Sequence, residues 1–159
     1  MTAKKTTKQP KAKQAKRSGK STESEAVAPS LAEAEASTSE ITFRDLGLSQ
    51  AMLASLDRAG YTRPTPIQAQ AVPLALKGRD LMGLAQTGTG KTAAFTIPLI
   101  ERLMGGPTRT RALVLTPTRE LCQQVEASVR KYGDGTGLEV VSVYGGVGYE
   151  PQTAALRAG

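Results

Sequence analysis

Residues 85–92, Ala-Gln-Thr-Gly-Thr-Gly-Lys-Thr, have the types and spacing best suited to chemistry in this sequence. Gly88 and Gly90 allow backbone N–H groups to turn inward around an anion. The Lys91 ammonium group can reach the outer phosphates of a nucleotide, and the Thr92 hydroxyl can bind Mg²⁺. A helix that begins here adds the partial positive charge of its N-terminus. The segment therefore predicts a loop that holds nucleotide phosphates.

Two known patterns compete for this segment. It fits the Walker A pattern, with Ala85 in place of the first glycine of the strict form. Residues 88–93 also fit the GxGxxA pattern of dinucleotide-binding proteins, which need an acidic residue at the end of the next strand. That strand ends here in Leu115-Thr116-Pro117, so the Walker A interpretation is favoured. A glycine-rich turn without a ligand is the remaining alternative.

The loop stands among alternating strand and helix patterns. Short apolar runs bounded by turn residues predict buried strands at residues 81–85, 112–116 and 138–143. Helices are predicted at residues 49–60, with Ser49 as the N-cap, and at 69–76, 91–103, 118–132 and 151–157. This alternation predicts an α/β fold, a parallel sheet with flanking helices.

Composition excludes several classes of site. The chain has no His and one Cys among 159 residues, which excludes His-dependent catalysis, His-ligated zinc and an intramolecular disulfide. Its longest mainly apolar run, residues 93–100, is too short to cross a bilayer. We therefore expect a cytoplasmic protein with no membrane partner.

The first 40 residues differ in charge from the rest. Residues 1–20 carry eight basic groups and no acid, whereas residues 21–40 carry five Glu and no base. They include no aromatic residue and almost no large aliphatic one, so we expect residues 1–40 to be a disordered basic, then acidic, tail. The basic part would attract the phosphates of a nucleic acid, or it would only keep the protein soluble.

Four segments, in order along residues 43–159, resemble motifs of the DEAD-box RNA helicases. Residues 60–68, Gly-Tyr-Thr-Arg-Pro-Thr-Pro-Ile-Gln, resemble the family's Q motif, and Phe43 occupies its upstream aromatic position. Residues 85–92 resemble motif I in its AxTGxGKT form, residues 117–121 resemble motif Ia, and Gly145-Gly146 resembles the GG motif. The resemblance, bacterial in style, implies that residues 41–159 are the N-terminal portion of a RecA-like P-loop NTPase domain.

The resemblance implies binding of ATP and Mg²⁺. Gln68 offers a donor and an acceptor together, which suits the edge of adenine and would distinguish ATP from GTP; an ordinary cap at the helix start is the alternative. By resemblance Tyr61 stacks on the purine, and Lys91 and Thr92 are the catalytic positions, with Thr92 holding Mg²⁺ through its hydroxyl. The predicted nucleotide-binding residues are Phe43, Tyr61, Gln68, Ala85, Gln86, Thr87, Gly88, Thr89, Gly90, Lys91 and Thr92.

A second set of residues is predicted to bind the backbone of RNA with little sequence specificity. Arg119 follows a predicted strand near a helix N-terminus, which suits an RNA phosphate; a salt bridge with Glu120 or Glu126 is the alternative. The glycines allow close backbone approach, or they form a plain turn. The predicted RNA-binding residues are Pro117, Thr118, Arg119, Gly145 and Gly146.

Neither predicted strand after the loop ends in an acidic residue, so the acid that helps to hold Mg²⁺ in phosphoryl transfer is absent. By resemblance the Asp-Glu-Ala-Asp box and a second RecA-like domain belong beyond Gly159. We expect ATP-dependent RNA unwinding in the intact protein, an inactive chain by itself, and uncovered apolar faces at residues 81–85 and 113–115. The alternatives are a non-catalytic nucleotide- or RNA-binding fragment and another P-loop ATPase. The sequence specifies no protein partner.

Overall fold

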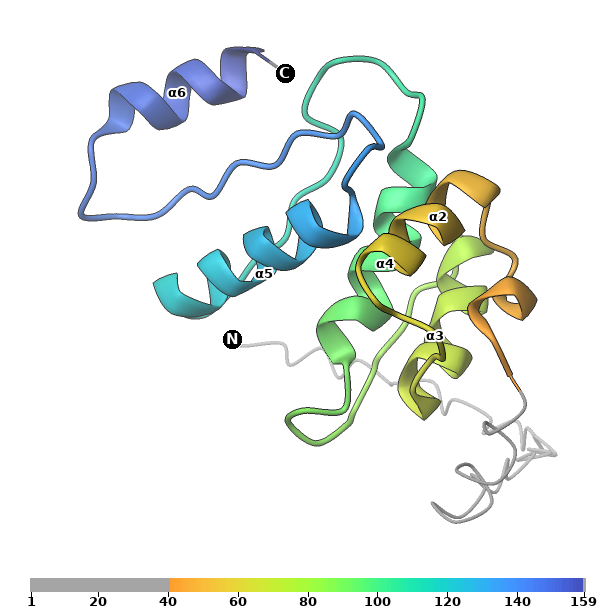
Figure 1. Cartoon of the computed structure of the whole chain (residues 1–159). Coiled ribbons are helices and arrows are strands. Elements are labelled where there is room, and N and C mark those ends of the chain that lie inside the picture. Colours follow the sequence, from red (N-terminus) through yellow and green to blue (C-terminus); the bar gives the residue numbers. More distant parts are fainter. Residues whose placement is uncertain (1–40, 159) are drawn as a thin grey trace, which may run out of the picture.

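The computed structural model describes residues 41–158 (Figure 1). Within them the elements are η1 (Phe43–Leu46), α2 (Gln50–Arg58), α3 (Pro66–Leu76), α4 (Lys91–Leu103), α5 (Arg119–Tyr132) and α6 (Tyr149–Ala158). Figure 1 shows α2, α3 and α4 gathered together, α5 beside α4, and α6 apart at the end of a long extended segment. The tail predicted for residues 1–40 lies outside the described residues.

The predicted helices are confirmed, with starts shifted by up to three residues. The Ser49 hydroxyl accepts a hydrogen bond from the Met52 N–H at 3.3 Å and so begins α2. The Thr118 hydroxyl does the same for α5, accepting from the Leu121 N–H at 3.2 Å. α3 begins at Pro66 rather than at the predicted residue 69, because a proline in the first turn has no N–H to leave unpaired.

The three predicted strands are wrong as local structure. Residues 81–85, 112–116 and 138–143 are extended, but none of them forms a strand ladder within residues 41–158. A strand depends on hydrogen bonds to a neighbour, whereas a helix satisfies its backbone within one segment. The apolar runs are extended and lie outside the helices, but the described residues offer them no paired neighbour.

The large apolar side chains of residues 81–85 and 113–115 are exposed, as expected, whereas Leu138, Val140 and Val141 are partly buried. Met82 and Leu84 are 90% and 89% exposed, and Leu113 and Leu115 are 81% and 84% exposed. A cavity of about 640 Å³ lies between α5 and the extended segments at residues 105–116 and 136–143. It marks the place where two unpaired segments lie near each other, and it includes no residue of the 85–92 loop.

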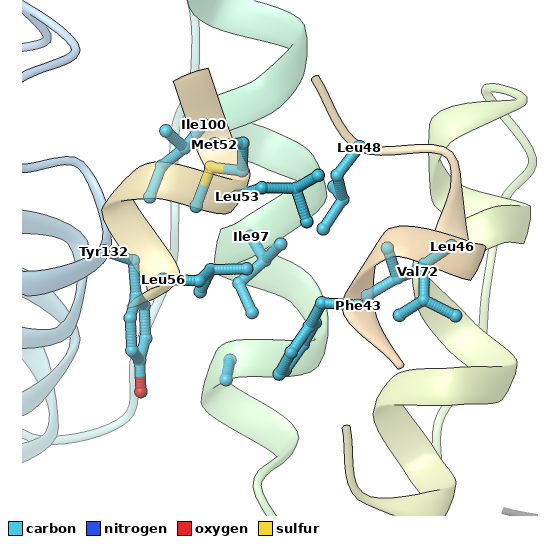
Figure 2. Close-up of a cluster of buried hydrophobic side chains, with 11 residues drawn as sticks. Phe43, Leu46, Leu48, Met52, Leu53, Leu56, Val72, Ile97, Ile100 and Tyr132 are labelled. Atoms are coloured by element: carbon cyan, nitrogen blue, oxygen red, sulfur yellow. The ribbon is translucent and has the colours of Figure 1, made fainter. Parts of the chain in front are cut away.

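The hydrophobic core lies between the helices. Figure 2 shows side chains of η1, α2 and α3 meeting those of α4, with Tyr132 from the end of α5 at one side. Met52 and Ile97 are fully buried and Leu56 is 1% exposed. Burial of one such side chain stabilises a fold by about 1.5–3 kcal/mol. This core fixes α4, whose N-terminus carries the 85–92 loop. In residues 41–158 no helix has the length and apolar character needed to span a membrane.

A buried hydroxyl ties α2 to the end of α5. The Ser55 hydroxyl, fully buried, lies 2.7 Å from the carbonyl oxygen of Tyr132 and 3.0 Å from that of Asp134. The Arg58 guanidinium also donates to the Asp134 carbonyl oxygen, at 2.5 Å, and lies 3.3 Å from its carboxylate. The end of α5 is therefore held by polar contacts as well as by the ring of Tyr132.

We expect Ser55→Ala to lower the free energy of unfolding by about 1–3 kcal/mol, because it leaves a buried carbonyl without its donor. Ser128→Ala is the matched control, since the Ser128 hydroxyl donates only to the Gln124 carbonyl of the same helix. That control should change stability by less than about 0.5 kcal/mol. Urea unfolding of both variants measures the difference, and equal effects would contradict the assigned role of Ser55.

Candidate functional site

The 85–92 loop reaches α4 through two glycines in the left-handed region. Gly88 has φ +83° and Gly90 has φ +89°, a conformation that other residues rarely adopt. Gly90 is the N-cap of α4 and supplies no side-chain acceptor, and the first turn of α4 contains no acidic residue. The first amides of α4 and its partial positive charge are therefore available to an anion. These features fit a phosphate group.

The Lys91 side chain folds back over the loop. Its ammonium nitrogen lies 2.5 Å from the carbonyl oxygens of both Ala85 and Gln86. The Thr89 hydroxyl donates to the same Gln86 carbonyl at 2.8 Å. The loop thus closes around its own cation, and a bound phosphate would replace carbonyl oxygens as the partner of Lys91.

Gln68 connects α3 to this loop. Its carboxamide oxygen accepts from the Thr65 N–H at 3.0 Å, and its Nε2 donates to the Gly90 carbonyl oxygen at 3.2 Å. The side chain is 2% exposed. A Cβ built at Gly90 would clash with Gln68 Nε2. The helix-start cap considered for Gln68 is therefore present, and the same amide also contacts the phosphate loop. Its contact with adenine stays a prediction.

Tyr61 lies against α5 as well as near the start of α3. Its ring meets that of Tyr132 edge to face, with centroids 5.1 Å apart, and the two hydroxyls are 2.8 Å apart. Burial, and then the hydrogen bond with Tyr61, raises the pKa of the Tyr132 phenol far above its usual range. The Lys131 ammonium lies 4.9 Å from the centre of the Tyr61 ring. Stacking of the purine on Tyr61 stays a prediction.

Two further residues predicted to bind the nucleotide, Phe43 and Thr92, lie in different surroundings. Phe43 is 3% exposed and belongs to the hydrophobic core, where its ring points from η1 toward α4 rather than facing solvent (Figure 2). Thr92 is partly buried in the first turn of α4, next to Lys91. No group of three or more His, Cys, Asp or Glu side chains in residues 41–158 could hold a metal ion. The binding of Mg²⁺ through the Thr92 hydroxyl stays a prediction.

The predicted RNA residues lie on two segments that the structure brings together. Pro117, Thr118 and Arg119 are exposed at the start of α5, and Gly145 and Gly146 are exposed in the loop before α6. The Arg119 guanidinium carbon lies 4.7 Å from the centre of the Tyr144 ring, directly before the glycine pair.

The salt bridge considered for Arg119 is not formed within the described residues. Glu126 instead lies 2.8 Å from the guanidinium of Arg130. A hydrogen bond from Ser142 is the largest cause that lowers the pKa of the Glu126 carboxyl, ahead of Arg130. Within residues 41–158 Arg119 therefore has no ion-pair partner.

Sequence reasoning missed Tyr144, Gln152 and Lys131 as neighbours of the site. Tyr144 stands beside the Gly145-Gly146 pair, and this adjacency was the one available signal. Gln152 and Lys131 reach the site only through contacts made after the chain folds, so no local pattern identifies them.

Comparison with known proteins points to one family. The family described as DEAD/DEAH box helicase matches residues 65–159. The chain is 40% identical over 141 residues to the ATP-dependent rRNA helicase rrp3 of Aspergillus terreus, covering 89% of this chain and 32% of that protein. It is 46% identical over 117 residues to the DEAD-box ATP-dependent RNA helicase CshA of Streptococcus pneumoniae, covering 74% and 22%.

Solved structures agree. The RNA-helicase Prp28 from Chaetomium thermophilum, bound to ADP, is 46% identical with a TM-score of 0.66, over 73% of this chain and 30% of that one. A DEAD box protein from Methanococcus jannaschii is 39% identical with a TM-score of 0.68, over 72% and 32%. These neighbours have RecA-like domains, so the α/β class is confirmed although its sheet is not paired here. The chain spans between about a fifth and a third of the length of these relatives.

We expect Gly90→Ala to weaken nucleotide binding more than Gly88→Ala. Both substitutions force a side chain into the left-handed region, at a cost of about 1–2 kcal/mol. Only the Cβ at position 90 also displaces Gln68, whereas a Cβ at position 88 meets no atom within 4 Å. Overpacking adds about 1–3 kcal/mol, so Gly90→Ala should bind fluorescent ADP at least about fivefold more weakly than Gly88→Ala. Equal affinities of the two variants would show that Gln68 does not support the loop.

Proposed function

This chain belongs to the DEAD/DEAH box helicase family, and we propose that it is the ATP-binding part of the first RecA-like domain of an ATP-dependent RNA helicase. The observation that carries the proposal is the contact between the Gln68 amide and the Gly90 carbonyl, 3.2 Å apart, which joins the candidate base reader to the phosphate loop. In the intact protein, ATP hydrolysis would drive the local separation of RNA strands.

The phosphates of ATP bind, in this proposal, at the N-terminus of α4. Its first amides and the backbone around Gly88 and Gly90 surround the phosphates, and Lys91 turns from the carbonyls of Ala85 and Gln86 to the outer phosphate. Mg²⁺, when bound through the Thr92 hydroxyl, would offset phosphate charge. The carbonyl oxygens of the closed loop therefore compete with the outer phosphate for the Lys91 ammonium group.

The amide of Gln68 keeps enough hydrogen-bonding capacity to read adenine. Its oxygen has a second lone pair beyond the bond from Thr65, and its nitrogen has a second hydrogen beyond the bond to Gly90. Adenine offers a matching donor at N6 and acceptor at N7. Because the side chain is 2% exposed, the base must displace whatever covers this amide. Tyr61 is the aromatic neighbour proposed to stack on the purine.

RNA binds, in this proposal, across the start of α5 and the loop before α6. Arg119 contacts a phosphate, and the exposed backbone at Pro117, Thr118, Gly145 and Gly146 approaches the same strand. Such contacts to the sugar–phosphate backbone carry little sequence information. This second surface separates the proposal from that of a P-loop ATPase with another substrate. A non-catalytic nucleotide- or RNA-binding role of this chain is the other candidate.

Gln68→Ala should reduce the preference for ATP over GTP, because the alanine offers neither donor nor acceptor. Loss of such hydrogen bonds costs about 1–3 kcal/mol, which is about five- to 150-fold in affinity for ATP. The measurement is competition of ATP and GTP against fluorescent ADP. The ratio of the two affinities is the decisive quantity, since loss of the cap on α3 alone would lower both equally.

Gln68→Glu is the conservative companion variant. Its carboxylate can still accept from the Thr65 N–H but cannot donate to the Gly90 carbonyl or to adenine N7. We expect it to keep the bond at the start of α3 and to lose the preference for ATP, while the buried carboxylate facing the Gly90 carbonyl oxygen also weakens binding of both nucleotides. Equal affinities of ATP and GTP for the unsubstituted chain would rule out adenine reading by Gln68.

The chain of residues 1–159 should release no phosphate from ATP beyond the level of a Lys91→Ala control, with or without RNA. The extended segments at 112–116 and 138–143 end in Thr116 and Val143, so neither supplies a carboxylate for Mg²⁺ or for the attacking water. In related nucleotidases an arginine finger alone contributes about 10³–10⁵ in rate. RNA-dependent turnover that disappears in the Lys91→Ala control would show that residues 1–159 suffice for catalysis.

A further inference from the structure

The ring of Tyr144 holds two side chains of α5. The Arg119 guanidinium lies over it at 4.7 Å, and Gln123 Nε2 donates to its hydroxyl at 3.1 Å. Arg119 and Gln123 are one helical turn apart, so they lie on the same face of α5. A single aromatic side chain therefore spans the first turn of the helix that carries the predicted RNA contacts.

The backbone of Tyr144 is fixed independently of its ring. Its N–H donates to the Gln152 side-chain oxygen at 3.0 Å, and Gln152 Nε2 donates to the carbonyl oxygen of Gly148 at 3.1 Å and to that of Tyr144 at 3.4 Å. One side chain of α6 thus pairs with the backbone on both sides of the glycine pair. These bonds hold the backbone from which the ring projects, and they do not depend on which side chain residue 144 carries.

We propose that Tyr144 is a positioning residue that holds the Arg119 guanidinium ready for a phosphate of single-stranded RNA; this rests on the RNA-binding function proposed above. A free arginine side chain has considerable rotamer entropy, part of which binding must remove. Stacking over an aromatic ring removes it in advance and leaves the N–H groups at the guanidinium edge free to bind phosphate oxygens.

The charge of Arg119 supports this role. No carboxylate in residues 41–158 forms an ion pair with Arg119. The Glu126 carboxylate, on the same helix, instead pairs with the Arg130 guanidinium at 2.8 Å. Arg119 is exposed, and the adjacent Gly145 and Gly146 are exposed as well. A stacked, solvent-facing and uncompensated guanidinium next to accessible backbone is suited to an external anion. A cation–π contact that only stabilises α5 would need no such exposure.

The test measures the affinity of the complete chain for a fluorescent single-stranded oligouridine by anisotropy, at several salt concentrations. Arg119→Ala should weaken binding about tenfold, as expected for a hydrogen bond to a charged group. It should also reduce the slope of log affinity against log salt by about 0.7, the value for one phosphate contact on a single strand. Tyr144→Leu should weaken binding about two- to fivefold, the range for an exposed cation–π contact, and lower the slope in the same direction.

Two further variants separate positioning from other roles. Tyr144→Phe keeps the ring and loses only the bond from Gln123, so it should restore the affinity and the slope to nearly those of the parent chain. Tyr144→Leu in the Arg119→Ala background should cause no further loss, because the ring acts through Arg119. Tyr149→Leu is the matched control, since Tyr149 is 81% exposed in the same region and should leave the slope unchanged.

The outcomes distinguish failure of the RNA site from failure of the positioning role of Tyr144. If Arg119→Ala leaves both affinity and slope unchanged, the RNA site proposed for this family member fails, and the role of Tyr144 fails with it. If Arg119→Ala lowers both while Tyr144→Leu lowers neither, only the positioning role is overturned. A further loss from Tyr144→Leu in the Arg119→Ala background, or an equal effect of Tyr149→Leu, would also overturn it. Circular dichroism of each variant confirms that the helices are retained.

Discussion

The buried amide of Gln68 is the contact on which the rest of the site depends. It closes the first turn of α3 through Thr65 and reaches the N-cap of α4 through Gly90. A buried side chain that satisfies backbone groups on two helices fixes their relative position, because moving either helix leaves a polar group unpaired. The need for glycine at position 90 follows from this, since any larger residue would occupy the space of the amide.

Within residues 41–158 the helices support this contact without a paired sheet. Met52, Leu56 and Ile97 are almost fully buried between α2 and α4, and Ser55 ties α2 to the end of α5. The phosphate loop therefore leads into a helix held by the core at its C-terminal end. At its N-terminal end it follows residues 81–84, which are exposed extended chain. Rigidity at the α4 end preserves the amides of its first turn, which are the groups that an anion needs.

Local signals in the sequence predicted the helices well and the strands poorly. Ser49 caps the helix that it was expected to cap, and Thr118, predicted as the start of the next long helix, caps that helix, because each bond joins residues three apart. The strands required partners distant in sequence, and apolar character alone does not create them. In the same way the phosphate loop was recognisable from its residues. The neighbours of the RNA surface, Tyr144 and Gln152, were not, since their roles arise from tertiary contacts.

The extended segments at residues 81–85 and 112–116 have a consequence for the handling of this chain in solution. Each combines β-branched or long aliphatic residues, exposed side chains and backbone that no ladder occupies. Such segments are templates for pairing between copies, the route to intermolecular β-structure and precipitation. The formal net charge of +7 acts against this through repulsion between molecules, and added salt screens that repulsion. Association between copies of this chain should therefore depend on ionic strength: it is opposed by charge repulsion at low salt and promoted when high salt screens that repulsion.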